Sequence, residues 1–398
     1  MPGSHAILAP SSAGRWLSCT PSARLEATFP DSSSQAAEEG SLAHKLGELL
    51  IRQATGKVTQ RIYNKELTAI KKDKLYDSSM WEYATDYSTF VMERFAEIKA
   101  EYGRATLLIE QKLNLSKYAP ESFGTTDIAI IANHYLEIID LKYGKGVPVY
   151  AENNPQMKLY ALGAIEELGF IYEDIETVCM TIYQPRIDNN SSSTISAEEL
   201  HDWGETVVKP NAKLAFEGAG EFKAGDHCRF CRMAATCKTN AAYNLELAKY
   251  EFRKDNQLTD EEIADILTRE KNFTTWLKTV TSYALSEAIN NGKEWPGWKL
   301  VHGRSVRSYS DGQEEEIVKS VLALDPDLDE AELFNRKIIS ITDMEKLIGK
   351  EDFARVLEDK GLVIKPAGKL TLAVISDKRK AVNSLQEAIE EFSDSEDD

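Results

Sequence analysis

The spacing of hydrophobic residues switches between helical and strand periods along the first 210 residues. Leucines three or four positions apart predict amphipathic helices near the N-terminus, and nearly continuous apolar runs predict buried strands after residue 104. The predicted elements are, in order, helices over 38–54 and 78–102, strands over 105–115, 125–132 and 135–142, a helix over 154–168, a strand over 176–184 and a helix over 197–209. Asn133 and His134 form a tight polar turn, so the second and third strands are expected to form a hairpin. This order predicts an α/β protein with a mixed central sheet flanked by helices.

The two ends of the chain carry weaker patterns. Residues 1–35 are rich in Ser, Pro and Ala and predict only a short helical piece over 15–26, and residues 191–193 are expected to begin a polar loop. Beyond Cys237 the expected elements are helices over 241–252 and 259–291, a short β-like piece after Trp295 and acidic helices to about residue 362. We therefore expect a first domain over 1–240, a mostly helical C-terminal extension over 241–385 and an acidic disordered tail over 386–398.

Composition narrows the class of protein. Hydrophobic residues make up 42% of the chain and charged residues 28%, which predicts a packed soluble core. The sequence has no run of 18 apolar residues and no secretory signal pattern, so no membrane partner is expected. Five cysteines in 398 residues are too few for a disulfide scaffold, and we expect a cytoplasmic protein.

The formal net charge of −18 argues against a broad surface for nucleic acid, which usually leaves a basic footprint. The acidity is uneven, however. Residues 1–245 carry 25 basic and 32 acidic residues, whereas residues 246–398 carry 22 and 33. The last 13 residues hold seven carboxylates and no Lys or Arg. Such a tail is typical of a solvated end, and a second hypothesis is that it imitates DNA and masks a binding channel.

The strongest candidate chemistry lies on the predicted hairpin. Asp140 and Lys142 are two positions apart near the end of one strand, so they share a face, and Asp127 on the neighbouring strand can meet them there. Two carboxylates at one point suit Mg²⁺ or Mn²⁺. A lysine beside such a metal can orient or deprotonate an attacking water. The alternative interpretation is a structural Asp–Lys ion pair at a strand end.

Two further motifs stand at matching places in the chain. His44 lies on the first predicted helix, four positions after Gly40, and Gln156 and Tyr160 share one face of the helix that follows the Asp-x-Lys strand. Together with the hairpin, these motifs resemble the RecB-like branch of the PD-(D/E)XK nuclease superfamily over roughly residues 7–240. One departure is that no proline precedes Asp127.

The resemblance implies a restriction-endonuclease-like core and a set of site residues. It implies that His44, Asp127, Asp140 and the Leu141 carbonyl bind Mg²⁺ or Mn²⁺. It also implies that Lys142 positions the attacking water. Gln156 and Tyr160 would then support the site or contact DNA.

Four cysteines suggest a second metal centre. Cys228, Cys231 and Cys237 form a C-x2-C-x5-C cluster, and Cys19 is the candidate for a remote fourth ligand. Cys179 lies within a predicted strand and is interpreted as a small buried hydrophobe. The pattern resembles the iron–sulfur staple of RecB-like and AddB-like exonucleases, which implies a structural [4Fe–4S] cluster. The alternatives are Zn²⁺ in a four-cysteine site, or His227 in place of one thiolate.

The C-terminal third is interpreted on weaker signals. Trp295, Trp298, Arg304 and Arg307 predict either a basic aromatic surface for single-stranded nucleic acid or a packed β-hairpin with solvated arginines. The whole chain resembles an uncharacterised family of phage and prophage proteins. That resemblance implies a setting in recombination or replication inside a bacterial host, with a phage single-strand-binding or recombination protein as a possible partner.

Two functions from different classes follow. The first is a metal-dependent deoxyribonuclease, an exonuclease that processes the ends of linear duplex or single-stranded DNA in phage recombination or replication. The second is a non-catalytic iron–sulfur protein that holds DNA or a replisome partner. The intact set of Asp127, Asp140, Lys142 and His44 favours the first.

Overall fold

The chain of the computed structural model divides into two units, residues 1–295 and 296–398. The structure describes residues 6–29, 34–169, 175–246 and 258–299, with short pieces at 318–319, 349, 353–358 and 362–363. All the strands described belong to the first unit. The predicted elements between residues 300 and 348, the basic residues Arg304 and Arg307, and the acidic tail lie outside the described residues.

A five-stranded mixed sheet forms the centre of the first unit, with its strands in chain order. The strands are β1 Ala105–Asn114, β2 Phe123–Ala132, β3 Tyr135–Leu141, β4 Thr177–Gln184 and β5 Asn189–Ser196. Neighbouring strands are antiparallel except β3 and β4, which are parallel. A parallel pair requires a crossover, and the helix between β3 and β4 supplies it.

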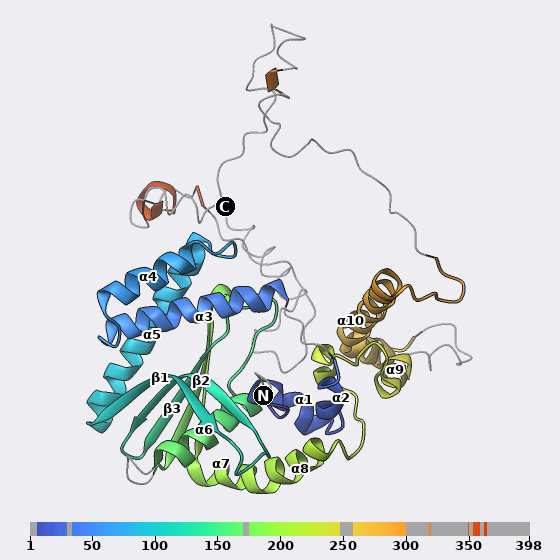
Figure 1. Ribbon diagram of the computed structural model, residues 1–398, viewed down its shortest axis with the longest axis horizontal. Helices are drawn as coiled ribbons and strands as arrows, with labels where there is room; N and C mark the ends of the chain where they lie inside the picture. Colours follow the sequence, from blue (N-terminus) through green and yellow to red (C-terminus); the bar gives the residue numbers. More distant parts are fainter. Residues whose placement is uncertain are drawn as a thin grey trace, which may run out of the picture. The chain divides into compact units, whose positions relative to one another are not determined.

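Helices cover both faces of this sheet (Figure 1). On one face, α5 (Ser78–Tyr102) packs on β1–β3, and α3 (Gln35–Ala54) and α4 (Gln60–Lys71) pack beside it. On the other face, α6 (Pro155–Leu168) packs on β1–β4, with α7 (Ala197–Trp203) and α8 (Lys209–Glu217) beyond it. Each face buries its own hydrophobic cluster. These observations confirm the predicted α/β architecture with a mixed, helix-flanked sheet.

Four further α-helices among the described residues belong to the N-terminal and C-terminal parts of the first unit's chain. Two short helices, α1 (Ala13–Ser18) and α2 (Ser22–Glu26), pack on α8. After α9 (Lys238–Leu245), the long helix α10 spans Asp260–Asn291 and begins with a capping box between Thr259 and Glu262. This agrees with the helix predicted over 259–291. No helix in the described part of the chain is long and apolar enough to cross a membrane.

Several local predictions were wrong. Residues 191–193 belong to strand β5 and not to a loop, because this edge strand pairs along β4 with serines that alternate in exposure and leave no apolar pattern to detect. The helical piece over 15–26 is two helices that meet at Cys19. Helix α4 was missed. The helix predicted over 197–209 continues through one π-helical turn, Gly204–Val208, into α8.

The side chains of β1 and β2 exchange the sheet faces to which they point on either side of Glu110. Leu107 belongs to the cluster on the α5 face, whereas Leu113 belongs to the cluster on the α6 face, although six positions separate them and a regular strand would keep both on one face. Glu110 has a left-handed backbone with φ of 49°. The pairing register continues on either side of it, with Ile109 opposite Ile128. The reversal therefore leaves Glu110 opposite Asp127 at a break in the ladder.

A buried acid ties α5 to the sheet. Glu137 on β3 is fully buried, and its carboxylate lies 2.7 Å from the Arg94 guanidinium of α5. The Thr181 hydroxyl of β4 donates to the same carboxylate at 2.8 Å. A buried charge is tolerated when it is paired and hydrogen-bonded in this way, so Glu137 is a structural acid.

Two helix glycines offer a matched test of the packing. A Cβ at Gly163 of α6 would lie 2.9 Å from Leu115 Cδ2 and 3.1 Å from Leu113 Cβ, whereas a Cβ at Gly40 of α3 meets nothing within 4 Å. We expect Gly163→Ala to lower the free energy of unfolding by about 1–3 kcal/mol, because it overpacks the interface between α6 and β1. Gly40→Ala should raise it by up to about 1 kcal/mol, because alanine has the higher helix propensity. Denaturant unfolding of both variants checks this, and equal stability of the two would contradict the packing described.

Candidate functional site

The Asp127 carboxylate joins a helix to two strands. His44 of α3 places its Nδ1 atom 3.1 Å from Asp127 Oδ1, and the Leu141 backbone N–H of β3 donates to Asp127 Oδ2 at 2.7 Å. Burial alone would raise the pKa of Asp127, but His44 and the Leu141 N–H lower it, so the group stays ionised. Burial opposes protonation of His44, but Asp127 outweighs it and raises the pKa of His44 to about 9.

A second set of side chains surrounds Asp140. Lys142 Nζ lies 2.8 Å from Asp140 Oδ2, and the Gln156 amide of α6 donates to Asp140 Oδ1 at 3.1 Å. The Gln156 carbonyl oxygen accepts from Lys142 at 3.1 Å, and its amide nitrogen also lies 3.3 Å from the Tyr160 hydroxyl oxygen. The Asp-x-Lys and Gln-x3-Tyr motifs therefore meet as one hydrogen-bonded network.

Burial shapes the charges in this network. Asp140 is 3% exposed, and burial raises its pKa while Lys142 lowers it in part. Burial alone would lower the pKa of Lys142, but Asp140 raises it, so Lys142 carries a positive charge. Burial and then Asp140 raise the pKa of the Tyr160 hydroxyl, which keeps it neutral. The ammonium of Lys142 is thus held between Asp140 Oδ2 and the carbonyl oxygen of Gln156.

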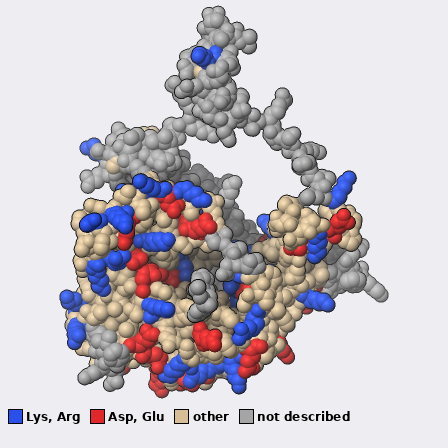
Figure 2. Space-filling view, viewed as in Figure 1, with Lys and Arg blue, Asp and Glu red and all other residues tan. Residues whose placement is uncertain are grey.

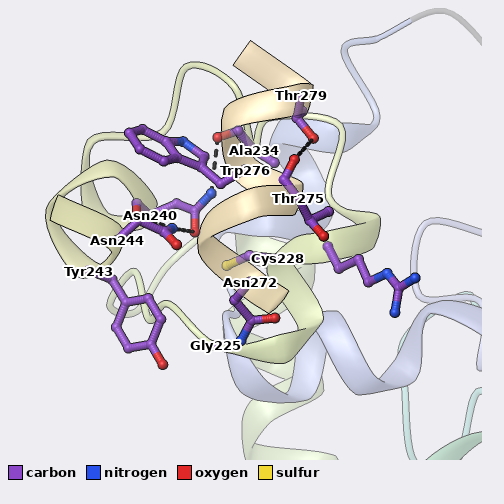
Figure 3. Close-up of a pocket in the computed structure, with 11 residues that line it drawn as sticks. Gly225, Cys228, Ala234, Asn240, Tyr243, Asn244, Asn272, Thr275, Trp276 and Thr279 are labelled. Atoms are coloured by element: carbon purple, nitrogen blue, oxygen red, sulfur yellow. Dashed lines mark hydrogen bonds between the residues drawn. The ribbon is translucent and has the colours of Figure 1, made fainter. Parts of the chain in front are cut away.

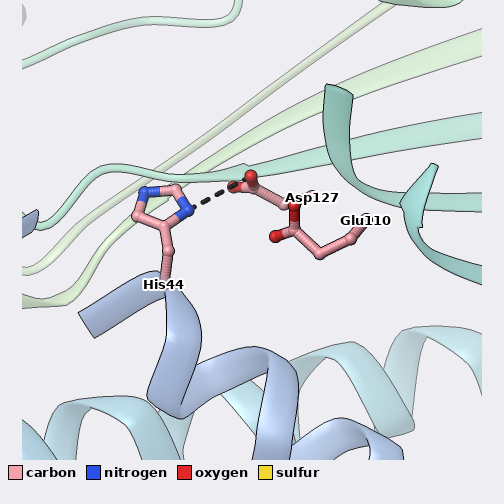
Figure 4. Close-up of side chains that lie close together, drawn as sticks. All are labelled: His44, Glu110 and Asp127. Carbon is pink, nitrogen blue, oxygen red and sulfur yellow. Dashed lines mark hydrogen bonds and ion pairs between the residues drawn. The ribbon is translucent and has the colours of Figure 1, made fainter. Parts of the chain in front are cut away.

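Glu110 is a site residue that the sequence analysis missed. Its carboxylate, the His44 imidazole and the Asp127 carboxylate each offer a ligand atom within 4.8 Å of the others (Figure 4). Among the residues that the structure describes, this is the group that meets that distance, and Asp140 is not part of it. Burial, Asp127 and Glu48 raise the pKa of Glu110 to about 7. Glu110 is one of several polar residues within 105–115, so no specific sequence signal pointed to it.

The arrangement can hold divalent cations. Carboxylate oxygens with one imidazole nitrogen form a donor set that suits Mn²⁺ and, through the oxygens, Mg²⁺. Asp127 belongs to both sets of side chains, since one of its oxygens faces His44 and the other faces the Leu141 N–H beside Asp140. The donors present therefore fit the expected cation.

The four candidate cysteines lie around one pocket. Cys19, between α1 and α2, lines it together with Cys228, Cys231 and Cys237, which follow about 200 residues later. Cys179 lies apart from them, 6% exposed in the cluster on the α5 face. His227 also lines the pocket, with its Nε2 atom 2.9 Å from the Lys223 carbonyl oxygen.

Protein contacts also hold the N-terminal segment against the cysteine loop, which is residues 218–237 between α8 and α9. The Thr20 hydroxyl donates to the Ala219 carbonyl at 2.7 Å, and Glu26 accepts from the Arg232 backbone N–H at 2.9 Å. On the far side of the loop, Cys228 and α10 line a second pocket (Figure 3), where Asn272 donates to Asp226 at 2.6 Å. The cysteine loop is thus packed between α1–α2 and α10.

Of the predicted aromatic surface, the structure describes Trp295 and Trp298 but not Arg304 and Arg307. The Trp295 indole N–H donates to the Ala284 carbonyl of α10 at 3.0 Å, and its ring packs edge-on against Tyr283. Trp298 is 82% exposed. Trp295 therefore packs against the end of α10, and both the nucleic-acid surface and the packed β-hairpin with solvated arginines stay predictions.

The fold and site define a mixed α/β protein with a carboxylate–imidazole cluster at one end of its hairpin and four cysteines around a separate pocket. Residues 5–380 match the family described as "Protein of unknown function (DUF2800)", and the chain belongs to this family. The chain is also similar to the solved structure titled "Crystal structure of SSO0001", with 15% identity over 57% of this chain and 96% of that chain, at a TM-score of 0.22. So low a TM-score carries no argument about the site.

Proposed function

We propose that this protein is a metal-dependent deoxyribonuclease with a PD-(D/E)XK core, an exonuclease that processes DNA ends. The observation that carries the proposal is the network in which Asp140, Lys142 and Gln156 meet beside Asp127. A structural Asp–Lys pair would need neither the second carboxylate nor His44 beside it. The order of motifs that resembles the RecB-like branch supports the same assignment.

The chain's own residues have separable roles in this proposal. Asp127 and Asp140, with His44 and the Leu141 carbonyl, would hold Mg²⁺ or Mn²⁺. The bound cation would supply a Lewis acid that activates water and stabilises charge on the phosphate. Lys142, held by Asp140 and Gln156, is oriented to position that water and to neutralise developing charge. Gln156 and Tyr160 fix Asp140 and Lys142 from the helix side.

The negative net charge is compatible with this function. Figure 2 shows Lys and Arg side chains interspersed with Asp and Glu on the viewed face, without a broad basic area there. Part of the acidity belongs to Asp127, Asp140 and Glu110, whose charge a bound cation offsets. We therefore propose that DNA is held at few phosphates close to the site, through the cation and Lys142, and not across a broad basic surface.

We also propose a [4Fe–4S] cluster at the four cysteines. The support is that Cys19 and the three later cysteines line one pocket. Four thiolate ligands suit such a cluster. Its role would be to reinforce the contact between α1–α2 and the cysteine loop.

Nuclease activity is tested on end-labelled linear duplex and single-stranded DNA with Mn²⁺ or Mg²⁺. We expect cleavage by the wild-type protein and a loss of at least about 100-fold in Asp140→Asn and Lys142→Ala, because each removes charge from the reacting centre. Asp202→Asn and Lys213→Ala, at exposed positions, are matched controls that should cleave as the wild type does. Circular dichroism confirms that each variant is folded. Intact DNA with both metals, or full activity in both site variants, would refute the proposal.

The cysteine centre is tested by anaerobic purification with iron and zinc quantitation and visible absorbance. We expect about four iron atoms per chain and a broad visible band, both lost in Cys231→Ser. Cys179→Ser is the matched control and should keep its iron, because Cys179 lies in the sheet core. One zinc per chain without iron would establish the alternative metal. Iron retained in Cys231→Ser would show that this thiol is not a ligand.

A further inference from the structure

Glu110 and Asp127 face each other across β1 and β2. Glu110 falls opposite Asp127 at the break in an otherwise continuous register. Like charges directly opposite on paired strands repel, and a left-handed backbone is unfavourable for a residue with a side chain. Glu110 combines both costs, with φ of 49°. Unlike the buried acid Glu137, which has Arg94, Glu110 has no arginine or lysine ion pair among the described contacts.

The ligand atoms at this break converge from three elements. Glu110 on β1, Asp127 on β2 and His44 on α3 come within 4.8 Å of one another (Figure 4). Asp140 is engaged elsewhere, 2.8 Å from Lys142 and 3.1 Å from Gln156. The side chains around Asp127 therefore form two sets, one with His44 and Glu110 and one that reaches Asp140 through the Leu141 N–H.

A buried hydroxyl gives an independent sign of a ligand. Tyr87 of α5 is 2% exposed, and its Oη atom has no hydrogen-bond partner among the residues that the structure describes. The Tyr87 hydroxyl lies close enough to Asp127, Asp140 and Glu110 for these carboxylates, after burial, to raise its pKa. Buried hydroxyls are nearly always paired, with protein or with an ordered water. A water bound to a cation at this point would supply the missing acceptor.

Gly47 of α3 makes room for this tyrosine. Gly47 lies three residues after His44, and a Cβ there would lie 3.0 Å from Tyr87 Cδ1. Any larger residue would press on the ring. The helix that carries His44 thus also packs closely against the Tyr87 ring.

We propose that His44, Glu110 and Asp127 bind a second divalent cation, with the Tyr87 hydroxyl donating to a water on it. The inference rests on the proposed function for the first cation, which keeps Asp127, Asp140 and the Leu141 carbonyl, and it assigns His44 to the second. One imidazole with two carboxylates suits Mn²⁺ better than Mg²⁺, which prefers an all-oxygen shell. Of two cations that share a carboxylate, one can bind the attacking water and the other can stabilise the leaving oxygen.

The test is an Mn²⁺ titration of the full chain, followed by electron paramagnetic resonance and calorimetry. We expect two Mn²⁺ per wild-type chain, one in Glu110→Gln and one in Asp140→Asn. Glu121→Gln is the matched control, because Glu121 is also an exposed glutamate with a left-handed backbone, at φ of 52°, and it should bind two. Tyr87→Phe should keep both sites but bind the second Mn²⁺ about three- to tenfold more weakly, the effect of one lost hydrogen bond.

A thermal melt in EDTA adds a readout that does not depend on metal affinity. Glu110→Gln should melt at a higher temperature than the wild type without metal, because it removes the repulsion with Asp127. A lower melting temperature would mean that Glu110 stabilises the metal-free fold, and would overturn the inference.

The outcomes separate this inference from the proposed function. A single Mn²⁺ in the wild type, or two in Glu110→Gln, overturns the second cation even if DNA is cleaved. Two Mn²⁺ with the expected losses support the second cation even if no DNA is cleaved, and in that case the nuclease proposal fails alone.

Discussion

The Asp127 carboxylate is the constraint on which the rest of the site depends. A buried carboxylate is costly unless partners replace the water it loses, and Asp127 takes its partners from His44 on α3 and from the Leu141 N–H on β3. Those two contacts set the position of a helix relative to the hairpin. They also place Asp140 and Lys142, which flank Leu141, beside Asp127. Both proposed cations would be held through this one side chain.

The break in the β1–β2 ladder at Glu110 explains why the site lies where it does. A regular ladder would send alternate residues of β1 and β2 to fixed faces, and one face would be filled by α5 and the other by α6. The left-handed residue Glu110 reverses the faces of the β1–β2 pair. Residues of one parity pack in the α5 core before it and in the α6 core after it. Polar side chains can occupy the crossing point without entering either core. Strain of this kind persists only where the surrounding structure over-determines the backbone, and it is concentrated at functional sites.

The N-terminal segment connects the cysteine pocket to the same hairpin. Cys19 lies at the pocket, and the residues before it pass behind the start of β2, where the Ser122 hydroxyl donates to the Leu8 carbonyl at 2.7 Å. A Cβ at Gly124 would lie 2.8 Å from Pro10 Cγ and 2.9 Å from Tyr160 Cε1, so only glycine admits both neighbours. Fixing this segment at the cysteines therefore also supports the strand that carries Asp127, three residues further on.

The sequence by itself determined the helices and strands with clear periods, the hairpin, and the pairing of Asp140 with Lys142 and of Gln156 with Tyr160. These features depend on residues two to four positions apart, whose relative direction follows from the local backbone. Only the tertiary structure decided that Glu110 and Tyr87 face Asp127, and that a strand of serines completes the sheet. A local pattern cannot contain them, because a left-handed residue inside a strand, a buried hydroxyl and an edge strand are each fixed by contacts between segments distant in the chain.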